Sequence, residues 1–281
     1  MKAKIALFII ILISLITLKP YDEVCSQSSD KYYESGTTKF YEDKFMEAII
    51  DFNKAIDLNP ASLKTYVLRA QAYFRLEKYD LAFKDIDKAI ELDDEMSITY
   101  TLRGSFNSEL NKYQDAIDDF SMALKLYPSD EIALRGRAEA YEAIGQYENA
   151  IKDYSSAIKL NPEEASFYFN RALLYMQIED PSKMNLEYAL IDVSKAIELE
   201  PGKTNYYTLR GEIYSQLLKL QPALDDFTTA IELDNEYAFA YFKRGYLKMK
   251  SFDFDGACID LKRAYELGYQ EAKVLIDDLC K

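Results

Sequence analysis

Apolar and small residues recur along the chain at helical spacings, and one block returns from about Ser29 to the C-terminus with a period of 34 residues. Its clearest copy is residues 131–164, whose first half carries Leu134, Ala138 and Tyr141 at intervals of four and three. The second half of the block repeats these intervals. Because each set falls on one stripe of a helix, the block predicts two amphipathic helices.

Residues that disfavour helix separate the two halves of the block and end it. Gly145-Gln146 interrupts the pattern between the halves. Asn161-Pro162 ends the second half, because proline disfavours helical geometry in the residue before it. The block occurs in seven copies, called repeats one to seven, at residues 29–62, 63–96, 97–130, 131–164, 165–203, 204–237 and 238–271. The fifth copy is lengthened by five residues around Pro181, and loop insertions of this size cost little free energy.

Small residues mark the positions where the two helices of a copy must approach closely. Alanine occupies the twentieth and twenty-seventh positions of all seven copies, and the eighth position is glycine or alanine. Larger side chains there would overpack the interface between helices, at a cost of roughly 1–3 kcal/mol. The sequence therefore predicts an array of stacked helical hairpins with a continuous core between neighbours.

This pattern resembles the tetratricopeptide repeat family. The resemblance implies an all-α, right-handed α-solenoid of seven helix–turn–helix units in one elongated domain over residues 27–281. The last residues, 270–281, carry Ala272, Leu275, Ile276 and Leu279 at helical spacing. We expect them to form a capping helix over the last exposed face of the array.

The N-terminal segment lies outside the repeats and has the layout of a secretory signal peptide. Lys2 and Lys4 precede an apolar run over residues 5–18, which spans about 21 Å as a helix and falls short of a membrane core of about 30 Å. Cleavage before Gln27 removes residues 1–26, whereas an uncleaved segment would act as an anchor. The sequence thus predicts an exported protein, periplasmic or secreted, of a bacterial envelope.

The sequence lacks the residues and motifs that most enzyme mechanisms require. There is no histidine among the 281 residues, which excludes Ser-His-Asp and Cys-His nucleophile arrangements. No Gly-rich phosphate loop or paired Cys-x-x-Cys is present, and residues 253–256 lack the later ligands of a calcium loop. We expect no enzyme, no cofactor and no metal site. The net charge of −14 argues against binding to nucleic acid or anionic lipid.

A charged pair recurs with the repeat. Position 23 is aspartate in every copy, and position 7 is arginine in repeats two to seven. Repeat one lacks the arginine and has no preceding aspartate. We expect each aspartate to pair with the arginine of the following repeat, 18 residues on, as Asp51 with Arg69. The alternative is that these are independent solvated charges.

Two cysteines remain after cleavage of the signal peptide, Cys258 and Cys280. If the second helix of repeat seven and the cap form an antiparallel hairpin near Gly268-Tyr269, the two cysteines lie at matching levels. Export would expose them to oxidising conditions. We therefore expect a disulfide, the alternative being two buried thiols.

The resemblance also implies a binding groove lined by the first helices of successive repeats. Carried over position by position, the expected groove residues are Tyr33, Phe40, Phe74, Arg135, Glu139, Glu142, Phe169, Leu173, Met176, Phe239, Phe242, Tyr246 and Met249. No pair of copies matches the Lys/Asn carboxylate clamp of the chaperone-binding members. The apolar residues of repeats five to seven are expected to hold an apolar or amphipathic segment, unless they belong to the core. Glu139 and Glu142 would favour basic residues in it.

The function expected from these features is non-catalytic binding of a protein or peptide partner, as a scaffold or adaptor in the cell envelope. Contact with the membrane is expected only through the N-terminal segment, if it is uncleaved. Two alternatives remain open at this point: a structural protein that self-assembles end to end, and an accessory protein that binds a small molecule. The sequence does not decide the oligomeric state.

Overall fold

The computed structural model describes residues 28–178 and 183–280, and within these ranges all regular secondary structure is helical. The expected all-α fold class is confirmed. The expected signal peptide, residues 1–26, lies outside the described residues, as do residues 179–182 of the insertion in repeat five.

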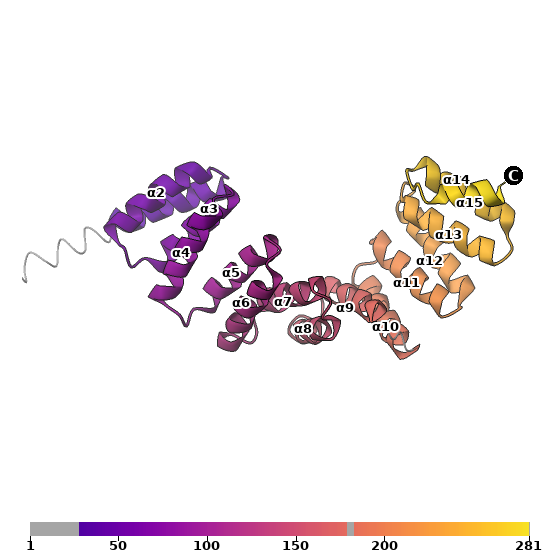
Figure 1. Ribbon diagram of the computed structural model, residues 1–281, viewed down its shortest axis with the longest axis horizontal. Coiled ribbons are helices and arrows are strands. Elements are labelled where there is room, and N and C mark those ends of the chain that lie inside the picture. The colour runs from indigo at the N-terminus through magenta and orange to yellow at the C-terminus, as the bar shows by residue number, and fades with distance from the viewer. Residues whose placement is uncertain (1–27, 179–182, 281) are drawn as a thin grey trace, which may run out of the picture. The chain divides into compact units, whose positions relative to one another are not determined.

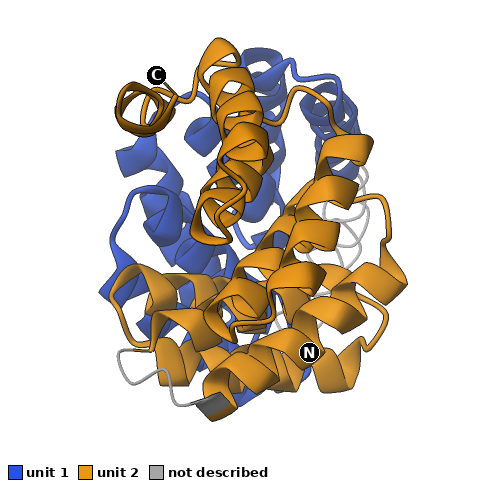
Figure 2. Cartoon of the chain, turned by 90° about the vertical axis from the view of Figure 1, so that its right-hand side faces the viewer, with its two compact units in different colours: residues 1–133 blue, residues 134–281 orange. Residues whose placement is uncertain are grey.

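The chain divides into two compact units, residues 1–133 and 134–281 (Figure 2). Unit 1 contains a helix over residues 28–41, then α2 (Phe45–Leu58), α3 (Leu63–Arg75), α4 (Tyr79–Leu92), α5 (Ser97–Glu109) and α6 (Tyr113–Leu126). The next helix, α7 (Glu131–Ala143), begins in unit 1 and continues into unit 2. Unit 2 also contains α8 (Tyr147–Leu160), α9 (Ala165–Gln177), α10 (Lys183–Leu199), α11 (Thr204–Gln216), α12 (Leu220–Leu233), α13 (Ala238–Lys250), α14 (Phe254–Glu266) and α15 (Ala272–Leu279).

Within each unit, consecutive helices pack as hairpins (Figure 1). The pairs are α3 with α4, α5 with α6, α9 with α10, α11 with α12 and α13 with α14. The second helix of one hairpin then packs against the first helix of the next, as α12 does against α13. Each unit is therefore a solenoid in which a hairpin contacts mainly its neighbours along the chain.

The small residues that recur in the sequence are the points of closest approach. Every alanine at the twentieth and twenty-seventh positions is completely buried: Ala48, Ala55, Ala82, Ala89, Ala116, Ala123, Ala150, Ala157, Ala189, Ala196, Ala223, Ala230, Ala257 and Ala264. At the eighth position, a Cβ added to Gly211 would lie only 2.8 Å from Cε1 of Phe227. The glycine is needed because the ring of the paired helix fills the space of its side chain.

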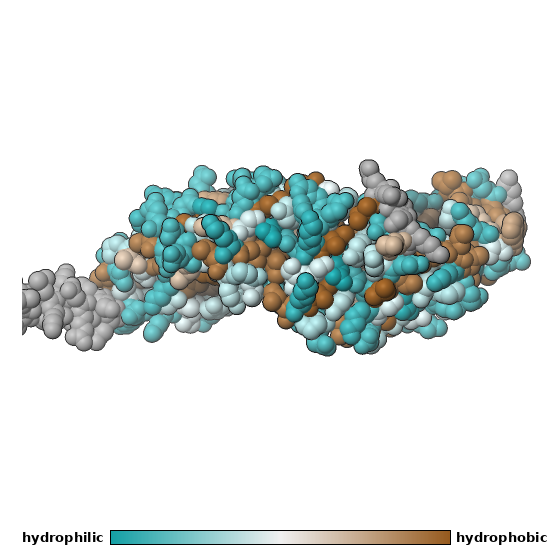
Figure 3. Space-filling model, turned by 90° about the horizontal axis from the view of Figure 1, so that it is seen from below, coloured by the Kyte–Doolittle hydropathy of each residue, from teal (hydrophilic) through white to brown (hydrophobic). Residues whose placement is uncertain are grey.

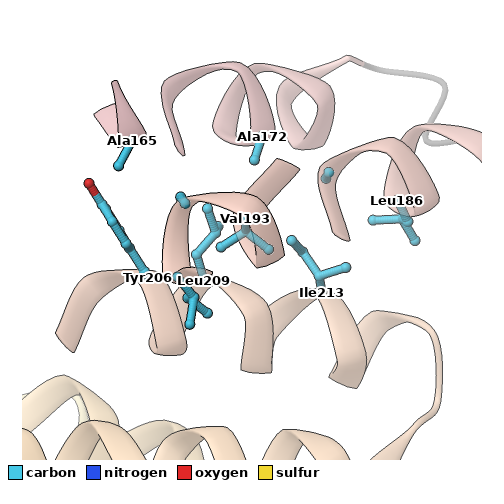
Figure 4. Packing of buried hydrophobic residues seen from close by; sticks show 10 residues of the cluster. Ala165, Ala172, Leu186, Val193, Tyr206, Leu209 and Ile213 are labelled. Carbon is cyan, nitrogen blue, oxygen red and sulfur yellow. The ribbon is translucent and has the colours of Figure 1, made fainter. Parts of the chain in front are cut away.

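The core between α9, α10 and α11 shows how the hairpins share apolar side chains. In Figure 4, Val193 of α10 lies between Ala172 of α9 and Leu209 of α11. Val193 and Ala172 are completely buried, and Leu209 is 4% exposed. A side chain of one hairpin thus contributes to its own core and to the junction with the next hairpin.

The hairpin turn of every repeat except repeat five, whose turn lies outside the described residues, uses a left-handed residue. Gly145 has a φ of 74°, as expected from the break in the sequence pattern. The same turn in repeats one, two, three, six and seven has non-glycine residues with φ between 58° and 63°: Asp43, Glu77, Asn111, Leu218 and Phe252. In repeat six, the N–H of Lys219 donates to the carbonyl of Tyr214 across this turn, 2.8 Å away. This hydrogen bond ends the first helix as in a Schellman motif.

The recurring arginine and aspartate pair within a copy, so the expected pairing between copies is wrong. Arg69 Nε lies 2.6 Å from Asp85 Oδ2, and Arg69 Nη2 lies 2.7 Å from Asp85 Oδ1. The same two-bond pairing joins Arg137 to Asp153, Arg171 to Asp192, Arg210 to Asp226 and Arg244 to Asp260, and Arg103 also pairs with Asp119. Because the second helix returns antiparallel along the first, position 7 faces position 23 of its own hairpin.

The arginine still links neighbouring copies, but through its third nitrogen. Nη1 of Arg69 donates to Oδ1 of Asn53 at 2.6 Å, and Nη1 of Arg103 donates to Oδ1 of Asp87 at 2.7 Å. In unit 2, Arg171 and Arg244 donate in the same way to the hydroxyls of Ser155 and Thr228. Each acceptor lies two residues beyond the aspartate of the preceding copy. The recurring aspartate was therefore close to the true contact in sequence, but it was not the residue that the arginine of the next copy reaches.

Repeat one replaces the arginine with two other donors. Asp51 accepts from Lys39 Nζ at 2.6 Å and from Ser35 Oγ at 2.7 Å. Lys39 is the eleventh residue of its copy, and Lys248 at the same position of repeat seven also reaches its aspartate, Asp260, at 2.8 Å. The aspartate is therefore satisfied in repeat one, although the sequence suggested that this copy lacks the pair.

The cap helix α15 packs against α14. Ala272 and Leu275 contact the buried Leu261 and Ala264 of α14. Cys258 of α14 and Cys280, which follows α15, have their Sγ atoms 2.08 Å apart and their Cα atoms 5.6 Å apart. The disulfide joins the cap to the last hairpin.

We predict that Asp226→Ala destabilises the protein by about 3 kcal/mol, because Asp226 is 4% exposed and its loss leaves the guanidinium of Arg210 without its partner. The control is Asp277→Ala, which removes an exposed pair with Lys273 and should cost less than about 1 kcal/mol. Urea unfolding followed by circular dichroism measures both. Equal losses in the two variants would contradict a structural role for the buried pair.

We further predict that the double substitution Cys258→Ser and Cys280→Ser lets the cap helix α15 separate from α14 more often. The bond closes a segment of 22 residues, and its removal should cost about 3 kcal/mol. Amide hydrogen exchange should accelerate in α15 and the adjacent end of α14, while α3 and α4 keep their protection. Unchanged exchange in α15 would show that packing alone holds the cap.

Candidate functional site

An aromatic surface lies at the C-terminal end of unit 2. It consists of Phe239, Phe242 and Tyr246 of α13 together with Tyr269, which precedes α15. The ring centroid of Phe242 lies 4.5 Å from that of Tyr269 and 6.4 Å from that of Tyr246. Tyr246 is 38% exposed, and both phenylalanines are half-buried. The first helix of repeat seven thus presents a partly exposed group of rings, as the sequence predicted.

Sequence reasoning missed Tyr269, which was expected only as part of a turn. Gly268 just before it has a φ of 98°, and this turn brings Tyr269 to 5.9 Å from Phe239 between ring centroids. The signal was present as the Gly-Tyr pair between two helical patterns. The direction of the tyrosine depends on how the cap packs, which the sequence does not show.

Lysines flank the aromatic surface. Lys243 Nζ lies 4.7 Å from the ring centroid of Phe239, and Lys250 Nζ lies 5.1 Å from that of Tyr246. Lys243 also forms an ion pair with Glu212 of α11. Met249, another expected groove residue, is half-buried on the same helix. The rings therefore offer apolar contact with positive charge at their edge.

The expected residues of α9 lie at the border of the core. Phe169, Leu173 and Met176 are half-buried and pack against the buried cluster of α9, α10 and α11. The ring centroid of Phe169 lies 4.8 Å from that of Tyr206 in α11. These side chains fill the junction between two first helices and expose only their outer edges.

In unit 1, one expected groove residue belongs to the core. Phe74 is 8% exposed and stacks on Phe106 of α5, with ring centroids 4.1 Å apart and planes within 5°. The prediction that Phe74 lines the groove is therefore wrong. Position 12 of repeat two faces the first helix of repeat three, where Phe106 covers it. Tyr33 and Phe40 are half-buried.

Tyr33 lines a hollow of about 620 Å³ in unit 1. Leu63, Val67 and Ile98 also line it, and Ile98 is 49% exposed. A larger hollow of about 890 Å³ is lined mainly by charged residues, several of which already pair with one another, as Arg69 with Asp85. The smaller hollow is the more apolar of the two.

The expected charged residues of the groove lie together on α7 in unit 2. Arg135 Nε is 3.9 Å from Glu139 Oε1, a weak contact between two half-exposed side chains. Although 53% of the Glu139 side chain is exposed, partial desolvation raises its pKa. Partial burial and the nearby Glu139 raise the pKa of Glu142.

Tyr154 of α8 carries a hydroxyl inside the core of repeat four. It is completely buried, and its hydroxyl has no hydrogen-bond partner among the described residues. Burial, and to a lesser extent the charges of Glu139 and Glu142, raise the pKa of Tyr154 above its usual range, whereas the nearby side chain of Asn170 in α9 lowers it in part. The sequence singled out the two glutamates and did not indicate the buried hydroxyl of Tyr154.

Exposed apolar side chains also occur at the turns of repeats six and seven. Leu218 is 82% exposed and Phe252 is 81% exposed, both at the left-handed turn position. Other copies have aspartate, glutamate, asparagine or glycine there, so a comparison of copies would have singled out these two residues. In the view of Figure 3, apolar residues likewise reach the surface in small patches between hydrophilic ones.

The described residues can be compared with the requirements of a metal site and of a membrane span. Within residues 28–178 and 183–280, no group of three or more histidine, cysteine, aspartate or glutamate side chains is arranged to hold a metal ion. In the same part of the chain, no helix has both the length and the apolar character needed to cross a membrane. Aromatic rings, lysines and carboxylates on first helices can bind a partner through apolar contacts and charge.

Comparisons with known sequences identify the repeat. A family described as TPR repeat matches residues 139–178, and two families described as Tetratricopeptide repeat match residues 108–158 and residues 63–96 and 204–237. No curated protein matches the chain.

Solved structures with the same fold cover most of the chain. The C-terminal part of a TPR repeat-containing protein from Cytophaga hutchinsonii has a TM-score of 0.71 at 19% identity, covering 84% of this chain and 95% of its own. A tetratricopeptide repeat protein from Parabacteroides merdae has a TM-score of 0.61 at 20% identity, covering 91% of this chain and 100% of its own. YrrB, described as a TPR protein with an unusual peptide-binding site, has a TM-score of 0.57 at 22% identity, covering 65% of this chain and 92% of its own.

The family matches fall on repeats whose hairpins, buried alanines and turns the structure shows directly. At these identities the solved structures add the fold and nothing about the partner. The chain belongs to the tetratricopeptide repeat family.

Proposed function

We propose that this protein is a non-catalytic scaffold or adaptor that binds a segment of a partner protein along the first helices of unit 2. Tetratricopeptide repeat domains generally bind protein or peptide partners, which gives the class of function. The main support for placing the binding site in unit 2 is the aromatic surface of Phe239, Phe242, Tyr246 and Tyr269. Partly exposed aromatic rings are where binding energy concentrates in protein interfaces.

The exposure of the rings decides what kind of segment fits. Phe242 packs against the buried cluster of α14 and α15, so its ring forms the floor of the surface. Tyr246 is 38% exposed and stands free enough to contact a partner. Since Lys243 and Lys250 lie against the rings, the segment bound here is apolar or amphipathic, with room for an acidic residue at the edge.

We also propose that the protein acts outside the cytoplasm, in a bacterial envelope. The support is the signal-peptide layout of residues 1–26 and the disulfide between Cys258 and Cys280. Structural disulfides persist in oxidising compartments and are rare in the cytosol. The net charge of −14 supports a protein partner over nucleic acid.

We predict that Tyr246→Ala lowers affinity for the bound partner at least tenfold while the fold stays intact, because the residue contributes mainly an exposed ring. The matched control is Tyr265→Ala on α14. Tyr265 is also 38% exposed and also lies near a lysine, Lys273. Affinity capture with quantitative mass spectrometry compares the two variants with the unchanged chain. A partner captured equally well by all three would place the binding surface elsewhere.

We predict that the mature protein begins at Gln27 when it is isolated from envelope fractions of its source cells. Mass spectrometry of the intact chain, with N-terminal sequencing, measures this. The control is a variant with Lys2→Glu and Lys4→Glu, which should accumulate uncleaved because the positive n-region is lost. An unprocessed chain found mainly in the cytosol would contradict export.

A further inference from the structure

The aromatic surface takes one of its rings from outside α13. Three of its four rings belong to that helix, whereas Tyr269 lies between α14 and the cap helix α15. The N–H of Tyr269 donates to the carbonyl of Ala264 in α14 at 2.9 Å, and its carbonyl accepts from the N–H of Ala272 in α15 at 3.2 Å. The direction of the Tyr269 ring therefore depends on both helices.

The cap also supports the floor of the aromatic surface. Phe242 and Tyr269 pack against the same buried cluster, which consists of Leu261 and Ala264 of α14 and Ala272 of α15. Further apolar side chains of the cap pack against this cluster: Leu275, Ile276 and Leu279. Rings that are held in place before a partner arrives lose less freedom when it binds. The packed cap thus pre-organises Phe242 and Tyr269 for binding.

Non-covalent packing alone holds the cap weakly. Helix α15 has eight residues, and a helix of that length is not stable in water by itself. Among its residues, all of which the structure describes, only Ala272 at the N-terminal end is buried. Val274 is 66% exposed. The C-terminal end of the cap therefore depends on the disulfide between Cys258 and Cys280.

This disulfide lies at the border between core and solvent. Both cysteines are half-buried. In α14, Cys258 stands between Ala257, which is completely buried, and Ile259, which is 70% exposed. Because thiol–disulfide exchange requires access of a thiolate to one of the two sulfurs, a half-buried bond at an edge of the fold reacts more readily than one enclosed in the core.

We propose that the disulfide between Cys258 and Cys280 is a redox switch for the aromatic surface. In the oxidised chain the cap holds Phe242 and Tyr269 in the arrangement that binds the partner segment. Reduction releases the C-terminal end of the cap, the two rings lose their support, and the segment binds more weakly. This inference rests on the proposed function and adds a means of regulating the same site.

The last hairpin stays folded when the cap is released. Between α13 and α14, Nε and Nη2 of Arg244 lie 2.8 Å and 2.7 Å from the carboxylate oxygens of Asp260. Lys248 adds a second ion pair to the same aspartate. All three residues lie outside the cap. Reduction therefore changes how the rings are supported, while α13 remains in place to present them.

The reductant is an external dithiol. One of its thiolates attacks a sulfur of the disulfide, forms a mixed disulfide and releases the other cysteine as a thiolate. The second thiolate of the dithiol then displaces the remaining cysteine. Cys258 and Cys280 gain two electrons and two protons in total, and the dithiol is oxidised to a disulfide. Exchange with an oxidised dithiol reverses these steps and restores the cap.

The test uses the full chain with Cys25→Ser and ¹³C-labelled tyrosine rings, observed by NMR. The chain has three cysteines, so only Cys258 and Cys280 then respond to a reductant. The probe is a capped, uncharged, amphipathic ten-residue peptide of leucine and serine, followed through the Tyr246 signal, which Tyr246→Phe assigns. We expect dithiothreitol to weaken binding of the probe about tenfold, while the far-UV circular dichroism changes little.

Variants separate the cap from other effects of the reductant. The double substitution Cys258→Ser and Cys280→Ser should bind the probe as weakly as the reduced chain does, with or without dithiothreitol. Tyr269→Ala keeps the disulfide and should bind weakly in both states. The matched control is Tyr127→Ala, because Tyr127 is 55% exposed and follows α6 as Tyr269 follows α14. It should keep both the affinity and the redox response.

The outcomes distinguish failure of the switch from failure of the proposed function. If the probe shifts Tyr246 equally in the oxidised and reduced chains, the switch is wrong and the aromatic surface stands. Tighter binding after reduction would also overturn the switch, because the cap would then obstruct the surface. Full affinity in the double-serine variant would overturn it as well. If the probe binds in neither state, the aromatic surface and the switch both fail.

Discussion

The buried aspartate at position 23, paired with an arginine in repeats two to seven and with Lys39 in repeat one, is the constraint on which each hairpin depends. The aspartates at position 23 are 2–6% exposed, and a carboxylate at that depth requires a cation and hydrogen bonds to stay ionised. The arginine supplies two bonds to the aspartate of its own hairpin and, in several copies, a third to the preceding hairpin. One side chain thus fixes the register inside a repeat and the register between repeats.

The same geometry leaves the outer face of each first helix free of a role in the core. Because the arginine–aspartate pairs, the alanines and the position-24 side chains complete the core of each hairpin, the outer positions of the first helices are free to vary. Repeat seven places rings there, and repeat four places the carboxylates of Glu139 and Glu142. Repeat six has a glutamate at the position of Glu139, and this residue, Glu212, forms an ion pair with Lys243 of repeat seven.

Much of the candidate site could be predicted from the sequence, and the errors have physical causes. Position in the repeat placed Tyr246 and Glu139 among the outer residues of first helices, where both are exposed, whereas Phe242 packs partly against the cap. Phe74 was misplaced because its burial depends on Phe106 in the next repeat, a contact that periodicity does not reveal. Tyr154 was missed because its position reads as core, and the sequence does not show that its hydroxyl lacks a partner.

The sequence by itself determined the helices, their turns, the seven-fold repetition and the packing of alanines, because these depend on short-range spacing and side-chain size. Only the tertiary structure decided which aspartate each arginine meets. The arginine lies between position 23 of its own hairpin and position 25 of the preceding hairpin, and spacing along the chain does not show this arrangement. The tertiary structure also decided the division near residue 133, across which the repeat continues without a change in pattern. Contacts between neighbouring helices depend on packing angles, and those angles are set by all the side chains of an interface together.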